Sequence, residues 1–105
     1  MTYKFSGIPK KKLIEGIIGQ YIHTDTNTIG YITIEKGAIL PAHSHIHEQI
    51  TQVISGKLEM TIDGVTQVLE PDSITVIPSN AIHSANALTN CIVIDTFSPV
   101  REDYK

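Results

Sequence analysis

Apolar and polar residues alternate along short stretches of the chain, and Gly, Pro, Asn or Asp interrupts them every few residues. The clearest case is Leu58, Met60 and Ile62, which alternate with polar residues and so give a strand with one apolar face. Asp63-Gly64 follows, a pair that suits the positive φ angles of a two-residue hairpin turn. No long segment has the 3.6-residue spacing of an amphipathic helix. The pattern therefore predicts an all-β chain.

The other strands are predicted from runs rich in β-branched residues that end at turn residues. The expected strands cover residues 16–23, 31–35, 51–55, 57–63, 65–69, 73–77, 83–88 and 91–97. Helix is expected only as short pieces in the first dozen residues or the last few. Short strands at regular spacing are typical of a sandwich or barrel, and 105 residues suit one domain. We expect residues 1–105 to form that domain, with a barrel core over about residues 15–98.

Composition narrows the classes of partner. The net charge is −3, and Lys and Arg are scattered apart from residues 10–12, which we expect to be a solvated segment. The chain therefore lacks the basic face that nucleic-acid binding needs. It has no run of ~20 apolar residues for a membrane span, and no signal-peptide core near Met1. The lone Cys91 excludes an intrachain disulfide and fits a reducing compartment. We expect a cytoplasmic protein without nucleic-acid or membrane partners.

A group of histidines carries the first candidate chemistry. His43 and His45 are two residues apart, so on a strand their imidazoles point to the same side. If the strand continues, His47 and Gln49 share that side, and His83 follows a distant Pro turn. Imidazoles with an oxygen donor suit a divalent first-row ion such as Zn, Ni, Fe, Mn or Co. The alternative, surface histidines in a polar loop, explains a single histidine better than it explains this group.

The spacing of these residues resembles the two conserved motifs of cupins. Gly37, His43, His45, Gln49 and Gly56 are separated by five, one, three and six residues, as in the first motif. Residues 78–83, Pro-Ser-Asn-Ala-Ile-His, resemble the second motif. The resemblance implies a cupin barrel, also called a double-stranded β-helix or jelly roll. It also implies one divalent metal ion held by four ligands, namely His43, His45, Gln49 and His83.

The chain departs from the usual cupin pattern at three positions. Gln49 stands where most cupins have Glu, and Asp72 and Asn80 stand where glycines are usual. An amide in place of a carboxylate raises the net charge of the site by one. We expect weaker metal binding and a stronger Lewis acid. Asp and Asn tolerate the left-handed backbone that glycine would adopt. His47 stays open between an inward residue that touches substrate and a residue at the rim.

A second candidate group lies near the C-terminus. Alternation over residues 91–97 places Asp95 on the same strand face as Val93 and Phe97. A carboxylate among apolar residues is costly unless it is paired or functional. Arg101 follows in the next segment. Asp95 is therefore either a functional acid in a cavity or a strand-end residue that pairs structurally with Arg101.

A narrower resemblance covers about residues 30–104. The segments His-Ser-His-Ile-His-Glu-Gln-Ile-Thr and Asp-Thr-Phe-Ser-Pro-Val-Arg-Glu-Asp-Tyr resemble the small cupins of the pectin-degradation KdgF type. That family ketonises 4,5-unsaturated monouronates released from pectin or alginate. The resemblance implies a metal-assisted lyase or isomerase with Asp95 and Arg101 as catalytic residues. It implies substrate contacts from Phe97 and Arg101, with His47 as a further candidate. Small cupins commonly form homodimers, often through exchanged N-terminal strands, for which residues 16–23 are the candidate.

Two other functions are compatible with the same motifs. Cupin barrels also serve non-haem metal dioxygenases, and three histidines with a weak fourth ligand permit that chemistry. Oxygen uptake distinguishes a dioxygenase from an isomerase. The third possibility is a metal-dependent module that binds a small molecule without converting it, which predicts affinity without turnover.

Overall fold

The computed structural model describes residues 1–105, and almost all of its regular structure is β-strand. The strands are β1 (Lys11–Ile14), β2 (Ile17–His23), β3 (Thr28–Ile34), β4 (Ile39–His43), β5 (Glu48–Ser55), β6 (Leu58–Ile62), β7 (Val65–Leu69), β8 (Ile74–Ile77), β9 (His83–Ala87) and β10 (Cys91–Ser98). Two short 3-10 turns, η1 (Phe5–Gly7) and η2 (Glu102–Tyr104), are the only helical pieces. The prediction of an all-β chain is confirmed.

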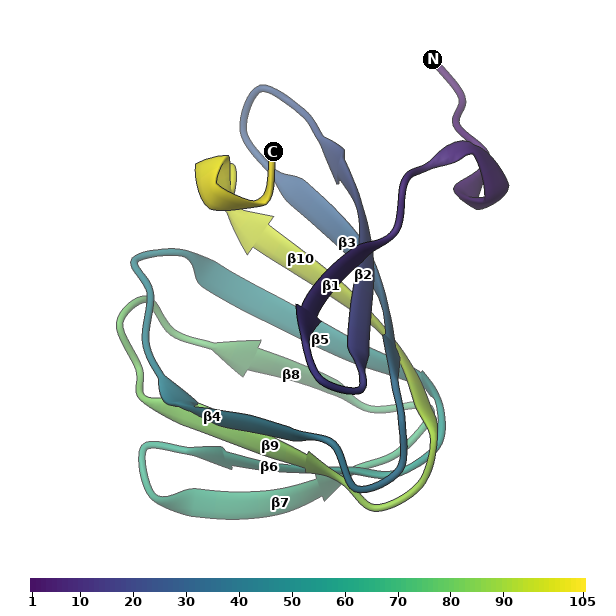
Figure 1. Cartoon of the computed structure of the whole chain (residues 1–105). Helices are drawn as coiled ribbons and strands as arrows, with labels where there is room; N and C mark the ends of the chain where they lie inside the picture. The colour runs from purple at the N-terminus through teal and green to yellow at the C-terminus, as the bar shows by residue number, and fades with distance from the viewer.

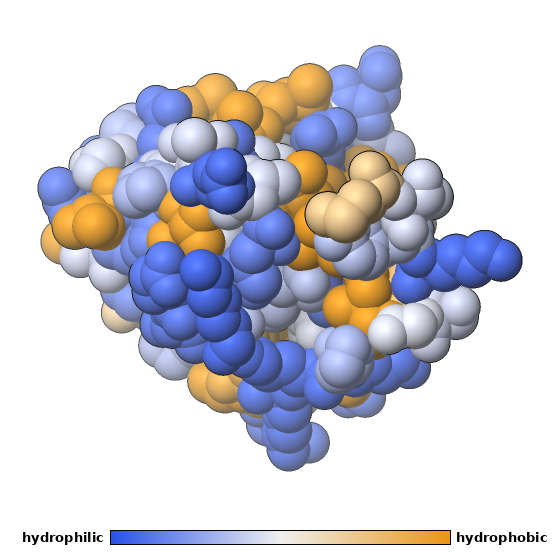
Figure 2. All heavy atoms as spheres, turned by 90° about the horizontal axis from the view of Figure 1, so that it is seen from above, coloured by the Kyte–Doolittle hydropathy of each residue, from blue (hydrophilic) through white to orange (hydrophobic).

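The strands form two antiparallel sheets that face each other (Figure 1). The six-stranded sheet has the order β1-β2-β3-β10-β5-β8, and the four-stranded sheet has the order β4-β9-β6-β7. Both termini lie at the same end of the molecule, and η2 sits above the end of β10. Seen from that end, the surface is mainly hydrophilic, with apolar side chains in separate patches (Figure 2).

The core lies between the sheets and follows from the alternation along each strand. Ile32, Val53, Met60 and Val93 are buried, as inward-facing residues of β3, β5, β6 and β10. β6 and β7 pair through the predicted hairpin, in which Asp63 and Gly64 have φ angles of 47° and 83°. This confirms the interpretation of Asp63-Gly64 as a turn.

The two residues that replace glycines of the second cupin motif adopt the conformation expected of them. Asp72 has a φ of 77° and Asn80 a φ of 65°, both in the left-handed region. Asn80 also donates its backbone N–H to the carbonyl of His45 over 2.8 Å. Asp and Asn are therefore tolerated in place of glycine. The Asn80–His45 hydrogen bond joins the turn before β9 to the loop of residues 44–47.

The N-terminal segment differs from the prediction. Lys12 is exposed as expected, but Lys11 and Lys12 both belong to β1, which the sequence did not predict. Lys11 is only partly exposed. Its Nζ donates a hydrogen bond of 2.7 Å to the backbone carbonyl of Tyr104. This contact joins the N-terminal strand to η2, the turn at the other end of the chain. No helix here has the length and apolar character needed to span a membrane.

Candidate metal centre and pocket

Three histidines come together between the two sheets. His43 ends β4 and His83 begins β9, and the two residues are paired directly across the strands. His45 lies in the loop that follows β4. One ring nitrogen from each of the three lies within 4.8 Å of the others, a separation suited to holding one metal ion. The expected grouping of these histidines is therefore found.

The prediction that one strand face carries His43, His45 and Gln49 is wrong. β4 ends at His43, and residues 44–47 form a loop before β5 begins at Glu48. His43, His45 and Gln49 therefore do not share one continuous strand face. The loop turns His45 toward His43, while Gln49 is buried on the inner face of β5.

Backbone carbonyls orient all three imidazoles. In each histidine Nδ1 lies at hydrogen-bond distance from a carbonyl oxygen, with the pairs His43–Pro41 (2.8 Å), His45–His47 (2.9 Å) and His83–Ala81 (2.9 Å). Such contacts fix the tautomer of metal-binding histidines and leave Nε2 free as the ligand atom. In His83 that Nε2 is buried without a hydrogen-bond partner. A metal ion bound at this Nε2 would satisfy the buried nitrogen.

The contacts of His45 give an independent indication of a cation. Burial, with the charge of Arg101 adding to it, lowers the pKa of His45 to about 4, so the ring carries one proton at neutral pH. Its Nδ1 faces the carbonyl of His47, and its Nε2 lies 3.1 Å from Oε1 of Gln49. One proton serves only one of these oxygens, which leaves a lone pair facing another lone pair. A metal ion beside Nε2 and Oε1 removes this conflict, so the residues present fit a divalent metal.

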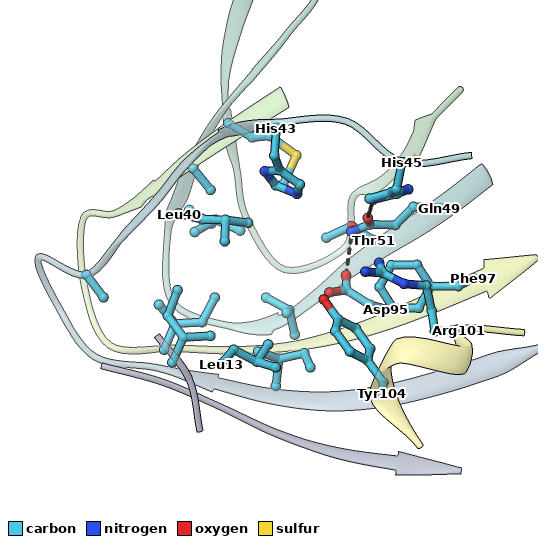
Figure 3. A pocket seen from close by; sticks show the side chains of 18 of the residues that line it. Leu13, Leu40, His43, His45, Gln49, Thr51, Asp95, Phe97, Arg101 and Tyr104 are labelled. Atoms are coloured by element: carbon cyan, nitrogen blue, oxygen red, sulfur yellow. Dashed lines mark hydrogen bonds between the residues drawn. The ribbon is translucent and has the colours of Figure 1, made fainter. Parts of the chain in front are cut away.

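The orientation of the Gln49 amide is set by its neighbour. Gln49 Nε2 donates to the hydroxyl of Thr51 over 2.9 Å, which leaves Oε1 directed at His45. Thr51 in turn donates to Oδ1 of Asp95 over 2.7 Å. Figure 3 shows this chain, with His43, His45 and Gln49 on one side of the pocket and Asp95 and Tyr104 on the other.

The pocket itself is a cavity of about 70 Å³, which has room for several water molecules. Its walls are mainly apolar, with Leu13 and Leu40 among them. The polar side chains that enter it are those of His43, His45, Gln49, Thr51, Asp95, Arg101, Tyr21 and Tyr104. An apolar cavity with a few converging polar groups is typical of a small-molecule site.

Asp95 faces this cavity from β10. Burial raises the pKa of its carboxyl to about 6, although the hydrogen bond from Thr51, the nearby Gln49 amide and the charge of Arg101 act in the opposite direction. A carboxyl group with a pKa near neutral exists in both protonation states at pH 6 to 7, as an acid–base residue requires. The predicted inward position of Asp95 is confirmed.

Arg101 is 7% exposed and forms no hydrogen bond or ion pair with Asp95. Its Nε and Nη2 donate to the two carboxylate oxygens of Asp103 over 3.0 and 2.8 Å. The guanidinium lies 4.8 Å from the ring centre of Phe97 and 4.0 Å from that of Tyr104. The edge formed by Nη1 and the second Nη2 hydrogen makes no side-chain hydrogen bond, so it is open to a carboxylate ligand.

His47 lies beside the cavity and not among the residues that line it. Its ring is 5.5 Å from that of His45 and 6.4 Å from that of Phe97. It borders a separate shallow depression that also includes Val100 and Asp103. This position corresponds to the rim, the second of the two alternatives for His47, and its contact with substrate stays a prediction.

Comparison with known proteins agrees with the fold and with the histidine motifs. A family model of the cupin domain matches residues 30–97. The chain belongs to the cupin family. This cupin is 33% identical over 99 residues to the pectin degradation protein KdgF of Dickeya dadantii (strain 3937). The aligned region covers 91% of this chain and 90% of that protein. The predicted resemblance to KdgF is thus confirmed.

Two solved structures resemble this cupin along nearly its whole length. KdgF from Halomonas sp. is 29% identical with a TM-score of 0.93, and the match covers 100% of both chains. An RmlC-like cupin from Shewanella frigidimarina NCIMB 400 is 30% identical with a TM-score of 0.92, covering 98% of this chain and 94% of the other. The match to KdgF from Halomonas sp. therefore includes all ten strands and the C-terminal turn η2.

Three cavity residues of this cupin were not predicted. Thr51 follows Gln49 by two residues on β5, so strand alternation would have placed it on the same inner face. Tyr104 comes from η2, where no periodic pattern indicates which way a side chain points. Tyr21 lines the cavity from β2, and no motif or spacing in the sequence singles it out.

Proposed function

We propose that this cupin is a metal-dependent enzyme that opens and ketonises 4,5-unsaturated monouronates derived from pectin or alginate. The observation that carries the proposal is the content of one cavity. Asp95, with its pKa raised to about 6, and Arg101, with its open edge, both border it, together with His43 and His45 of the histidine group. The similarity to KdgF, a protein named for pectin degradation, supports the substrate class.

The reaction needs one proton to leave the substrate and one to arrive. The substrate is a cyclic hemiacetal whose ring oxygen is attached to a C4=C5 double bond next to a carboxylate. Loss of the C1 hydroxyl proton lets the bond between C1 and the ring oxygen break, which forms an aldehyde at C1 and an enolate at C5. Protonation of C4 then gives the ketone, so the overall change is an isomerisation.

Asp95 is the group in the cavity suited to both proton transfers. As a carboxylate it takes the proton from the C1 hydroxyl, and as a carboxylic acid it delivers a proton to C4. Such general acid–base catalysis contributes typically about 10²- to 10⁴-fold. Thr51, which donates to Oδ1, holds the carboxyl group in one orientation and leaves Oδ2 for the substrate.

Arg101 and Phe97 position the substrate. The open edge of the guanidinium binds the substrate carboxylate with two parallel hydrogen bonds, while Asp103 holds the other edge. The buried ring of Phe97 provides an apolar wall for the sugar. A divalent ion held by His43, His45, His83 and the Gln49 amide oxygen would supply electrostatic stabilisation of negative charge developing on the substrate.

The test follows the vinyl proton at C4 by proton NMR. Metal-loaded protein is incubated with the monomer products of a pectate lyase and of an alginate lyase. We expect the vinyl signal to disappear faster than in buffer, equally well without oxygen, and slowly after removal of the metal by a chelator. Consumption of oxygen in step with substrate would favour a dioxygenase. A folded, metal-loaded protein that leaves both monouronates unchanged would refute the proposal.

A further inference from the structure

Tyr21 lines the cavity, and its hydroxyl group is buried without a hydrogen-bond partner. Tyr21 is 9% exposed and lines the same cavity as Asp95 and Arg101. Its Oη makes no hydrogen bond with any protein group. Burial is the main cause of a raised pKa of this phenol, so the hydroxyl stays protonated at neutral pH and acts as a donor. An unsatisfied buried hydroxyl is unfavourable, and in a residue that lines a cavity a bound group would supply the partner that the protein does not.

Two glycines allow the Tyr21 ring to lie flat on the sheet. A Cβ atom at Gly19 would come within 2.5 Å of Oη, and one at Gly30 within 2.6 Å of Cε1. Gly30 pairs with Tyr21 on one side and with Asp95 on the other, so the three residues form one row across β2, β3 and β10. The ring therefore covers Gly30 and Gly19, and the hydroxyl lies over Gly19.

The other face of the Tyr21 ring is covered by η2. The ring centres of Tyr21 and Tyr104 are 4.6 Å apart, and Arg101 packs on Tyr104. The hydrogen bond from Lys11 Nζ to the Tyr104 carbonyl holds this turn in place. Clamped between the sheet and Tyr104, the Tyr21 ring has no room to turn toward another protein partner.

The position of the hydroxyl relative to Arg101 suggests what it binds. If Arg101 holds the substrate carboxylate at C5, as in the proposed function, the opposite side of the six-membered ring carries the hydroxyls at C2 and C3. Tyr21 on β2 and Asp95 on β10 are separated by one strand, a spacing of ~10 Å between the two strands, and Arg101 lines the same cavity from the segment that follows β10. We propose that the Tyr21 hydroxyl donates a hydrogen bond to the C2 hydroxyl of the bound monouronate, which lies opposite C5 in the ring, and so selects between its stereoisomers.

The stereoisomers are those that the two polysaccharides produce. Introducing the C4=C5 double bond removes the stereocentres at C4 and C5, so the unsaturated monouronates from pectin and alginate differ in the relative configuration of C2 and C3. One fixed donor satisfies only one of the two arrangements well. A site built to pair with a substrate hydroxyl discriminates strongly against a substrate that leaves it unpaired.

The experiment compares Tyr21→Phe with wild-type protein on both monouronates, with Tyr31→Phe as the matched control. Tyr31 also belongs to the six-stranded sheet, but its ring packs on Phe5 away from the cavity. We expect wild-type kcat/KM to differ between the substrates by about 10-fold or more. In Tyr21→Phe the KM for the preferred substrate should rise about 10-fold, with kcat changed much less, so that the two kcat/KM values approach each other.

The melting temperature distinguishes recognition from a structural role. Tyr21→Phe should melt at or above the temperature of the wild type, because the hydroxyl removed has no partner in the protein. An unchanged ratio of the two kcat/KM values in Tyr21→Phe would overturn the inference, as would a lower melting temperature with unchanged KM. Wild-type protein that converts neither monouronate would refute the proposed function, and this inference with it.

Discussion

Thr51 donates its hydroxyl hydrogen to Oδ1 of Asp95 over 2.7 Å while it accepts one from Gln49 over 2.9 Å. This hydroxyl therefore fixes the orientation of the Gln49 amide oxygen and of the Asp95 carboxyl group at once. The candidate metal site and the candidate acid are two ends of one hydrogen-bond chain.

Removing this hydroxyl should disturb both ends. Thr51→Val keeps the shape of a side chain that is 1% exposed, but it loses both hydrogen bonds. Because the Thr51 contact lowers the pKa of Asp95, the acidic limb of the pH–rate profile should move to higher pH, by about one unit. Metal affinity should fall about 10-fold, as is typical when a residue that orients a ligand is lost.

Thr75→Val is the matched control for this change. Thr75 is the cross-strand partner of Thr51 on β8 and makes no side-chain hydrogen bond to the site. It should leave both the profile and the metal affinity as they are. A Thr51→Val protein with the wild-type pH profile would show that the hydroxyl does not influence Asp95.

Gln49→Glu should tighten metal binding, because it adds an anionic donor beside the three histidines. We expect at least a 10-fold lower dissociation constant in a competition titration with a chelating dye, and about one ion per chain by elemental analysis. Turnover should fall, since an added charge lowers the electrophilicity of the ion and faces Asp95 through Thr51.

Gln52→Glu adds the same charge to β5 on the opposite strand face, and should change neither property. An unchanged metal affinity in Gln49→Glu would mean that the Gln49 side chain is not a ligand. His47 would then be the next candidate to examine, because its ring lies beside that of His45.

The sequence predicts those parts of the molecule that depend on local chemistry. The hairpin at Asp63-Gly64 and the inward position of Asp95 follow from turn preference and from strand alternation. Strand β1 was missed because it is stabilised by pairing with β2 and by the Lys11–Tyr104 contact, which joins residues 93 positions apart. Alternation also predicted a continuous strand through His45, although the chain turns there between the two sheets.

In the candidate site, too, the sequence predicts local features and misses those that depend on contacts between distant parts of the chain. The spacing of the two motifs was sufficient to group His43, His45 and His83, because residues that could hold one metal ion recur at fixed positions in such motifs. The pairing of Arg101 with Asp103 depends on the conformation of η2. The position of the Tyr21 hydroxyl depends on Gly19 of the same strand and on Gly30 of the neighbouring strand β3. Neither feature has a signature in the sequence.

The raised pKa of Asp95 also predicts how stability depends on pH. The fold favours the protonated carboxyl, so this contribution is fully present below the unfolded value of 3.8 and is lost as the pH rises through about 6. At pH 8 the ionised group destabilises the metal-free protein by at most about 3 kcal/mol. Asp95→Asn removes that effect while keeping the acceptor for Thr51.

Urea denaturation of metal-free wild-type and Asp95→Asn protein at pH 5 and pH 8 measures this difference. Asp95→Asn should be the more stable protein at pH 8, and the gap should narrow at pH 5. Equal stability at pH 8, or a gap that widens on acidification, would show that the carboxyl has an ordinary pKa in the fold.

The central claim is that Asp95 carries the proton in a metal-dependent opening of an unsaturated monouronate. The most direct test is the turnover of metal-loaded Asp95→Asn, followed by proton NMR of the C4 vinyl signal beside the wild-type protein. The amide keeps the size and the hydrogen bond to Thr51 but cannot cycle a proton, so turnover should fall by at least ~10²-fold while metal content stays at the wild-type level. A folded, metal-loaded Asp95→Asn protein that consumes the substrate at close to the wild-type rate would contradict the account.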